Sequence, residues 1–306
     1  MIGGVLALGL TGLVSWPLVC ELRRTPLSNA LRDTAPGQFA DLTRGRTHYQ
    51  WFGPEDGDVL VCVHGLTTPS FVWGGLIPDL VAMGYRVLTY DHYGRGFSDR
   101  PRGLQDNAFF TGHLTELLDH LEIGDDITLM GYSMGGSVSA TWAADNPDRL
   151  RQLILLAPAG MGHDLGRTAE LVARFPILGD WVFHMAYPKQ FREGVARERG
   201  LPSAIPDIYD LQLQELHRRG FLRAVLSSLR GMLSQQLRRE HQVVHQSKVP
   251  VTAIWGADDT VIPIGCKTTL EQWNPRSEQA VIAGAGHGLA YTHVNDVISA
   301  IKDRRE

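Results

Sequence analysis

Residues 131–136 read GYSMGG and contain the pattern G-x-S-x-G, with Ser133 at its centre. A short apolar run, 127–130, precedes the pattern, and a helix-like stretch, 137–144, follows it. In a strand-to-helix turn this sharp, glycines two residues to either side of the serine avoid clashes with the neighbouring strand and helix. The string is common by chance, but this context predicts a nucleophilic hydroxyl presented at a helix N-terminus.

A serine hydroxyl attacks well only when a base removes its proton. The chain has 12 histidines, so position has to select the base. His287 lies in the segment 284–288 (GAGHG), between the last strand candidate and the final helix. Because the glycines permit a tight loop that turns the imidazole toward Ser133, we predict His287 as the general base.

The third group of such a site is a carboxylate that holds the tautomer of the imidazole. The segment 255–263 (WGADDTVIP) follows a strand candidate and offers two adjacent acids, Asp258 and Asp259. Both precede His287, and the order serine, acid, histidine is the one that a strand–turn–helix nucleophile predicts.

Short apolar runs and stretches of helical spacing alternate from about residue 46 onward. The runs that we predict as strands are 59–63, 85–90, 127–130, 153–156, 251–255 and 279–282. Such alternation predicts βαβ units and an α/β fold with a mostly parallel central sheet flanked by helices. The segment 160–248 contains no convincing strand, so we expect an all-helical cap over the carboxyl edge of the sheet, where ligands bind.

Two further motifs agree in order and spacing with these residues: His64-Gly65 after a strand run, and the turn 91–98 (DHYGRGFS). On all of these motifs, residues 47–301 resemble the α/β-hydrolase superfamily. The resemblance implies a core formed by 37–159 and 249–306, with the cap 160–248 inserted between two strands.

The resemblance also assigns roles that the residues alone leave open. In similar hydrolases the acid loop reads W-G-x-x-D-x-h-h-P, with h apolar, which puts Asp259 rather than Asp258 in the acid position. It further implies an oxyanion hole made by the backbone N–H groups of Leu66 and Met134, each worth about 3 kcal/mol in the transition state. His64 is then expected to brace the loop.

The predicted function is a serine carboxylic-ester hydrolase acting on an apolar acyl or alkyl group through an acyl-enzyme on Ser133. A thioesterase, a carbon–carbon bond hydrolase or a cofactor-free peroxidase would use the same triad, and a non-catalytic ligand-binding member of the fold is a further alternative. Serine at the elbow argues against haloalkane dehalogenases and epoxide hydrolases, which have aspartate there. The natural substrate and the oligomeric state stay open.

Composition limits the partners. The net charge of −4 and the absence of long like-charged runs give no indication of nucleic-acid binding. The cysteines at 20, 62 and 266 have neither disulfide-framework nor metal-ligand spacing. We therefore expect no metal and no cofactor, and a small apolar ester or lipid-like substrate.

The N-terminal segment 1–22 begins with about 20 uncharged residues, enough to cross a bilayer as a helix. Arg23 and Arg24 follow, and positive flanks favour the cytoplasmic side. These features predict a transmembrane anchor and a cytoplasmic catalytic domain, as in the membrane-anchored monoacylglycerol lipases that the chain resembles here. Four glycines and Pro17 weaken such a helix, so a helix packed on the domain or a loose surface segment is the open alternative.

One stretch of the cap is unusually apolar, and we expect part of it to line an acyl pocket above Ser133. Its members are Phe175, Ile177, Leu178, Trp181, Phe183, Met185 and Tyr187.

Overall fold

A computed structural model of the 306-residue chain describes residues 14–162, 172 and 175–303. Its strands are β1 (Gln38–Leu42), β2 (Gly45–Phe52), β3 (Asp58–Val63), β4 (Tyr85–Tyr90), β5 (Ile127–Tyr132), β6 (Leu150–Leu156), β7 (Val251–Gly256) and β8 (Glu278–Ile282). They form one eight-stranded sheet in the order β1-β2-β4-β3-β5-β6-β7-β8. The β1–β2 and β2–β4 pairs are antiparallel, and the other pairs are parallel.

All six predicted strands are present, and the mostly parallel sheet confirms the predicted fold class. The central strand β5 is buried at every position, as expected of a parallel strand covered by helices on both faces. The prediction did not include β1 and β2, which pair in antiparallel fashion at one edge of the sheet. Their half-exposed residues lack the continuous apolar run by which the other strands were recognised.

Besides a helical segment at 14–22, the α-helices of the described residues are α2 (Asn29–Arg32), α3 (Ile77–Ala82), α4 (Asn107–His120), α5 (Met134–Asp145), α7 (Pro176–Glu198), α8 (Ile208–Glu215), α9 (Phe221–Arg230), α10 (Arg238–Gln246), α11 (Gly265–Trp273), α12 (Leu289–Thr292) and α13 (Val294–Lys302). Short 3₁₀ turns are η1 (Ser70–Trp73), η2 (Pro147–Arg149) and η3 (Met232–Ser234).

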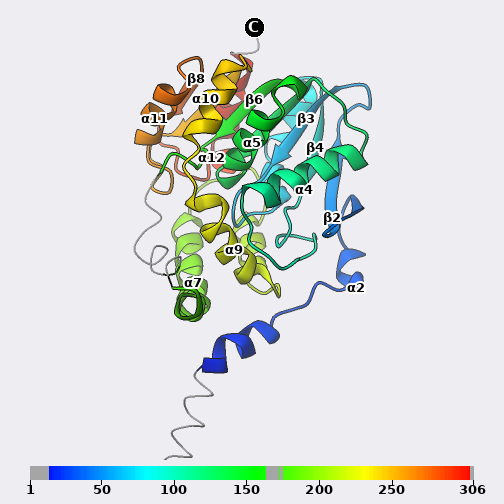
Figure 1. The fold of residues 1–306 in the computed structure, drawn as a ribbon, viewed down its shortest axis with the longest axis vertical. Helices are drawn as coiled ribbons and strands as arrows, with labels where there is room; N and C mark the ends of the chain where they lie inside the picture. Colours follow the sequence, from blue (N-terminus) through cyan, green and yellow to red (C-terminus); the bar gives the residue numbers. More distant parts are fainter. Residues whose placement is uncertain (1–13, 163–171, 173–174, 304–306) are drawn as a thin grey trace, which may run out of the picture.

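Alternate residues of β3 divide the core into two layers. Val61 and Val63 pack with α4, α5, α10 and α11 on one face of the sheet. Leu60 and Cys62 pack with α3, α12 and α13 on the other face. The two-residue period of a strand therefore places helices on both faces of a single sheet (Figure 1).

Between β6 and β7 the described chain is helical, and α7, α8 and α9 share a small apolar cluster of their own. This cluster includes Phe183, Leu216 and Phe221, all of them buried. Figure 1 shows α7 and α9 beyond one end of the sheet, whereas α10 lies beside α5. We retain the division into core and cap as a proposal, with α10 packed on the core side.

The N-terminal segment corrects the sequence-based prediction. The described part of this segment, residues 14–22, is helical and spans about 14 Å at 1.5 Å per residue. In the described part of the chain, no helix is both long enough and apolar enough to cross a membrane. The predicted transmembrane anchor is therefore wrong, and so is the membrane location with a cytoplasmic domain that we derived from it; residues 1–13 of the predicted span lie outside the described residues.

The chain that follows this helix is paired with the cap. The Thr25 N–H donates to the carbonyl of His217 (2.8 Å), and the Arg219 N–H donates to the carbonyl of Thr25 (2.8 Å). Glu21 accepts a hydrogen bond from the N–H of Gly220. Glu21, the first charged residue after the apolar run, thus forms a contact within the protein.

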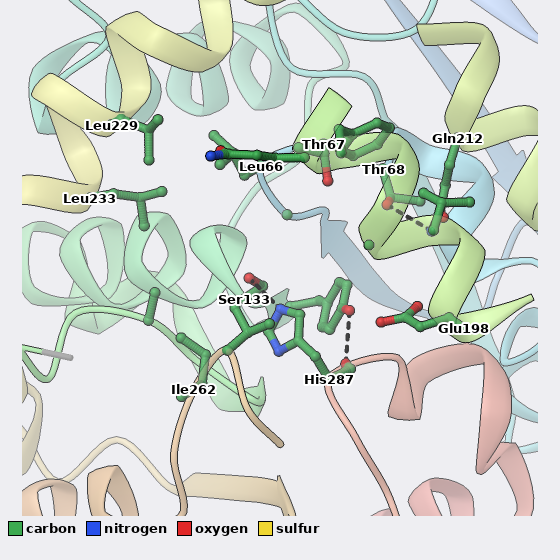
Figure 2. Close-up of a pocket in the computed structure, with 18 of the residues that line it drawn as sticks. Leu66, Thr67, Thr68, Ser133, Glu198, Gln212, Leu229, Leu233, Ile262 and His287 are labelled. Atoms are coloured by element: carbon green, nitrogen blue, oxygen red, sulfur yellow. Dashed lines mark hydrogen bonds between the residues drawn. The ribbon is translucent and has the colours of Figure 1, made fainter. Parts of the chain in front are cut away.

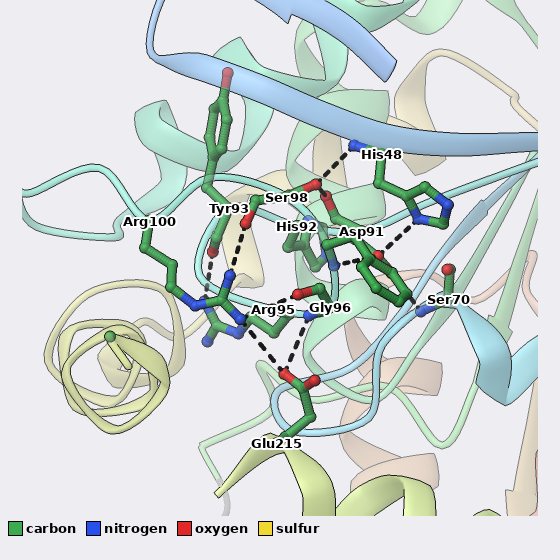
Figure 3. Close-up of polar contacts among 12 residues, drawn as sticks. His48, Ser70, Asp91, His92, Tyr93, Arg95, Gly96, Ser98, Arg100 and Glu215 are labelled. Carbon is green, nitrogen blue, oxygen red and sulfur yellow. Dashed lines mark hydrogen bonds and ion pairs between the residues drawn. The ribbon is translucent and has the colours of Figure 1, made fainter. Parts of the chain in front are cut away.

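The turn after β4 is built around a buried carboxylate, that of Asp91 (Figure 3). It accepts hydrogen bonds from the N–H groups of Ser70 (2.9 Å) and Phe97 (3.0 Å), and it pairs with Nδ1 of His48 (2.8 Å). Burial alone would raise the pKa of Asp91, but His48 and these backbone donors outweigh it and hold the pKa well below the ordinary value. This carboxylate therefore fixes β2, η1 and the 91–98 turn together.

We expect Asp91→Asn to lower the free energy of unfolding by about 3–5 kcal/mol, because it leaves His48 without its buried partner. Urea unfolding at pH 7 measures this change. Since the pKa of Asp91 is depressed on folding, the stabilisation should be present above its unfolded value and fade as the pH falls below about 4. The control Asp41→Asn removes an exposed carboxylate paired with Arg46 and should change little; equal effects of both variants would contradict the assigned role.

Candidate active site

Ser133 occupies the turn between β5 and α5 with φ 56° and ψ −121°, a backbone conformation that residues other than glycine rarely adopt. The flanking glycines make the turn possible. A Cβ on Gly131 would lie 2.4 Å from the carbonyl oxygen of Gly135, and one on Gly135 would lie 1.9 Å from that of Val63. The predicted elbow is thus present in the structure, and its serine projects from the carboxyl end of β5.

His287 reaches Ser133 from the loop after β8. Its Nε2 lies 2.9 Å from the Ser133 Oγ. The hydroxyl of Tyr132 donates to the backbone carbonyl of His287 (2.8 Å), and the Tyr132 ring lies against the imidazole with 5.3 Å between centroids. Tyr132 therefore positions the histidine, a role that the sequence analysis missed because the residue appeared only as a variable position of the elbow.

Asp259 completes the hydrogen-bonded chain. Its Oδ2 lies 2.8 Å from Nδ1 of His287, and its Oδ1 accepts the N–H groups of Val261 (2.7 Å) and Ile262 (2.8 Å). The carboxylate is thus oriented by two backbone donors and by the imidazole. The side chain of Asp258 is exposed, and the structure brings Asp259, not its neighbour, to the histidine.

The loop that contains Leu66 lies directly against the nucleophile. A Cβ on Gly65 would stand 3.2 Å from Cβ and 3.6 Å from Oγ of Ser133. Gly135, which follows Met134, abuts the carbonyls of Val63 and His64 in the same way. The 63–65 backbone is therefore packed directly against the Ser133 turn. We retain the oxyanion hole formed by the N–H groups of Leu66 and Met134 as a proposal.

Two buried histidines hold this loop. Nε2 of His64 accepts the N–H of His92 (2.9 Å), so Nδ1 carries the proton and faces the carbonyl of Gly65 (2.8 Å). Nε2 of His92 lies 3.0 Å from the carbonyl of His64. Burial lowers the pKa of His64 to about 4, so the imidazole is neutral at pH 7 and serves as a brace.

Arg95 was missed as well, because the 91–98 turn suggested glycine geometry alone. Its buried guanidinium donates from Nε to the carbonyl of Leu66 (2.9 Å), and from Nη2 to Oγ of Ser228 on α9 (2.7 Å). A further donor, Nη1, contacts Gln105. Burial lowers the pKa of Arg95 to about 9, which still leaves it charged at pH 7. One side chain thus connects the oxyanion-side loop to the cap.

A cavity of about 330 Å³ opens in front of Ser133 and His287. Its walls come from the 65–68 loop, α7, α8, α9 and the loops after β7 and β8. Of the seven apolar cap residues, part of which we expected here, Tyr187 alone lines the cavity; the other apolar cap residues in its wall are Phe191, Val195, Leu229 and Leu233. Phe183 is buried within the cap, and Ile177, Leu178 and Trp181 border a separate hollow beside residues 14–21.

Metal and thiol chemistry find no support in the described residues. No group of three or more His, Cys, Asp or Glu side chains there could hold a metal ion. Cys62 and Cys266 are buried, Cys20 is half-buried, and all three are free thiols. In front of the cavity, Ser133, His287 and Asp259 form one hydrogen-bonded chain.

Comparisons with known proteins agree with this architecture. The family model of the α/β hydrolase fold matches residues 58–181. A 2-hydroxy-6-oxo-2,4-heptadienoate hydrolase of Pseudomonas putida is 27% identical over 256 residues, which cover 81% of this chain and 88% of the relative.

Two solved structures share the fold over most of their length. A thermophilic esterase from Thermogutta terrifontis has a TM-score of 0.72 at 21% identity, covering 87% of this chain and 97% of its own. An enol-lactonase from Burkholderia xenovorans LB400 has a TM-score of 0.70 at 22% identity, covering 87% and 98%. The family match and the fold confirm the predicted resemblance.

We expect Asp259→Asn to lower kcat by about 10⁴-fold, because the amide cannot hold the required imidazole tautomer. Asp258→Asn, which changes the exposed neighbour, should leave kcat within about twofold, as surface changes usually do.

Ser133→Ala and His287→Ala should each lower kcat by about 10⁴-fold or more, with comparable losses because the groups act as one unit. Steady-state kinetics on p-nitrophenyl butyrate measure all four variants; a larger loss in Asp258→Asn would move the acid by one residue.

We further expect Arg95→Met to lower kcat by about 10- to 100-fold, because the Leu66 peptide would lose the donor that orients it. Affinity for a boronic acid, which places an oxygen in the oxyanion position, should fall in parallel. Arg100→Met is the matched control: Arg100 is also buried but donates to Ser98 and Gly96, away from residue 66. If both variants lost only stability, with kcat and boronate affinity unchanged, Arg95 would have no part in positioning the loop.

Proposed function

We propose that this hydrolase of the α/β-hydrolase superfamily is a serine enzyme that cleaves carboxylic esters with an apolar acyl or alkyl group. The observation that carries the proposal is the hydrogen-bonded chain from Ser133 through His287 to Asp259 at the wall of a largely apolar cavity. We assign these three residues as nucleophile, base and orienting acid.

In the first half of the reaction, the Ser133 Oγ attacks the ester carbonyl while Nε2 of His287 takes its proton. The negative charge that develops on the carbonyl oxygen is stabilised by the N–H groups of Leu66 and Met134. Asp259 stabilises the imidazolium through Nδ1 without taking its proton. The tetrahedral intermediate then collapses: the C–O bond breaks, His287 protonates the leaving alcohol, and the acyl group stays on Ser133.

In the second half, water replaces the alcohol. His287 removes a proton from the water as it attacks the acyl carbonyl, and the same two N–H groups stabilise the second tetrahedral intermediate. His287 then returns the proton to Oγ, which frees the carboxylic acid and restores Ser133. These steps need only the residues named and water.

A carbon–carbon bond hydrolase on the same three residues is the second candidate, favoured by the heptadienoate hydrolase among the relatives. A dienoate is a carboxylate anion, and proteins ordinarily hold such anions with Arg or Lys. The described residues lining the cavity include neither, and Glu198 adds a negative charge to the wall. The charge of the cavity therefore favours a neutral ester over an anionic dienoate.

A fluorophosphonate probe should label the purified protein, and Ser133→Ala should remain unlabelled.

On p-nitrophenyl esters, kcat/KM should rise about fourfold for each added CH₂ from acetate until the cavity is full, because a buried CH₂ is worth about 0.8 kcal/mol. Equal kcat/KM on acetate and octanoate would argue against an apolar acyl site. Faster turnover of 2-hydroxy-6-oxo-2,4-heptadienoate than of every ester would instead favour the second candidate.

A further inference from the structure

The cavity has two unlike ends, with Ser133 and His287 between them (Figure 2). We call these the apolar end, formed by Leu229, Leu233 and Ile262, and the polar end, formed by Thr68, Glu198, Gln212 and Tyr291. An ester bond held at Ser133 would therefore have its acyl part and its alcohol part in environments of different polarity.

The polar end is a pre-formed set of hydrogen bonds. The hydroxyl of Tyr291 donates to Oε2 of Glu198 (3.0 Å), and Nε2 of Gln212 donates to Oγ1 of Thr68 (3.2 Å). Thr68, Gln212 and Tyr291 are buried, with 7%, 5% and 3% of their surface exposed. These contacts come from α7, α8, α12 and the 65–68 loop, so they fix the polar groups before any ligand enters.

Glu198 has more acceptor capacity than these contacts use. A carboxylate offers about four lone-pair sites, and the Tyr291 hydroxyl occupies one of them. The carboxylate is half-buried in the cavity wall beside apolar side chains such as Val195, so its other acceptor sites are available to a bound ligand. Because no Lys or Arg belongs to the described lining, the matching ligand group is one that donates hydrogen bonds.

The position of His287 indicates which part of the ester meets this carboxylate. His287 gives its proton to the leaving alcohol, so the alcohol part must lie beside its imidazole. Tyr291, which holds Glu198, is in α12, directly after the His287 loop. The polar end therefore lies on the leaving-group side, and the apolar end is left for the acyl chain.

We propose that the polar end is an alcohol subsite, which selects esters whose alcohol part has a hydrogen-bond donor. Glu198 is its specificity-determining residue, and Gln212 and Thr68 complete its wall. The inference rests on the proposed ester hydrolysis and adds the substrate class: an apolar acyl chain joined to a hydroxyl- or ammonium-bearing alcohol.

Matched substrate pairs test this subsite. The 2-hydroxyethyl and propyl esters of butyric acid have nearly the same shape and differ in one donor. The 2-(dimethylamino)ethyl and 3-methylbutyl esters form a second pair, in which the donor is a protonated amine. We expect kcat/KM, measured by acid release in a pH-stat, to favour the donor-bearing member of at least one pair by about 10-fold, as hydrogen bonds to charged groups allow. The pair with the larger ratio identifies the source of the donor.

Glu198→Gln keeps the shape and an acceptor but removes the charge, so the ratio of the two kcat/KM values in a pair should fall several-fold. Glu193→Gln is the control, because Glu193 lies on the same helix with its side chain 56% exposed, paired with Lys189. This variant should keep the wild-type ratio. The thermal midpoint of each variant separates an effect on selection from a loss of fold.

The alcohol subsite would be overturned by kcat/KM ratios near one for both pairs, or by a preference that Glu198→Gln leaves intact. In either case, turnover of propyl butyrate would still support ester hydrolysis. Failure to hydrolyse any of the four esters would overturn both proposals together.

Discussion

Three backbone hydrogen bonds hold Ser133 in a conformation that costs about 1–3 kcal/mol on its own. The Ser133 N–H donates to the carbonyl of Leu156 (2.9 Å), and its carbonyl accepts from Gly136 (2.9 Å) and Ala159 (3.0 Å). The first and last of these contacts come from β6 and the chain just after it. The strain is thus sustained by the neighbouring strand, and every group that acts on Ser133 has to be brought to this one fixed point.

The loops that reach this point are tied to one another as well as to the sheet. The Ala257 N–H donates to the carbonyl of Ile282 (2.9 Å), and the Asp258 N–H donates to that of Ala285 (2.9 Å), which joins the acid loop to the histidine loop. On the other side, the buried charge of Arg95 connects the 65–68 loop with α9. The position of α9 and that of the 65–68 loop are therefore coupled through Arg95, which contacts neither Ser133 nor His287 by a hydrogen bond.

The strands of the core and the proximity of Ser133, His287 and Asp259 could be predicted from local patterns. These were continuous apolar runs for the buried parallel strands and, around Ser133, glycines where a Cβ would collide with backbone. The choice between Asp258 and Asp259 needed the family pattern, since adjacent residues differ only in which one turns inward. Tyr132 and Arg95 act through contacts with residues distant in sequence, which no spacing encodes. The N-terminal prediction failed because it used hydropathy alone, whereas no helix in the described part of the chain is both long and apolar enough to cross a membrane.

The residues that line the cap side of the cavity could not be predicted from the sequence for a related reason. Catalytic geometry tolerates almost no substitution at Gly135, where an added Cβ would approach a carbonyl oxygen to 1.9 Å, whereas a cavity wall accepts many side chains of similar size. Whether Glu198 or Gln212 faces the cavity depends on how α7 and α8 rotate against the sheet, and that is set by packing across the whole cap. The same sheet and turn can then be combined with differently lined caps, which explains why hydrolases with different named substrates share this fold. For this reason, the charge of the cavity is more informative about the substrate than the fold is.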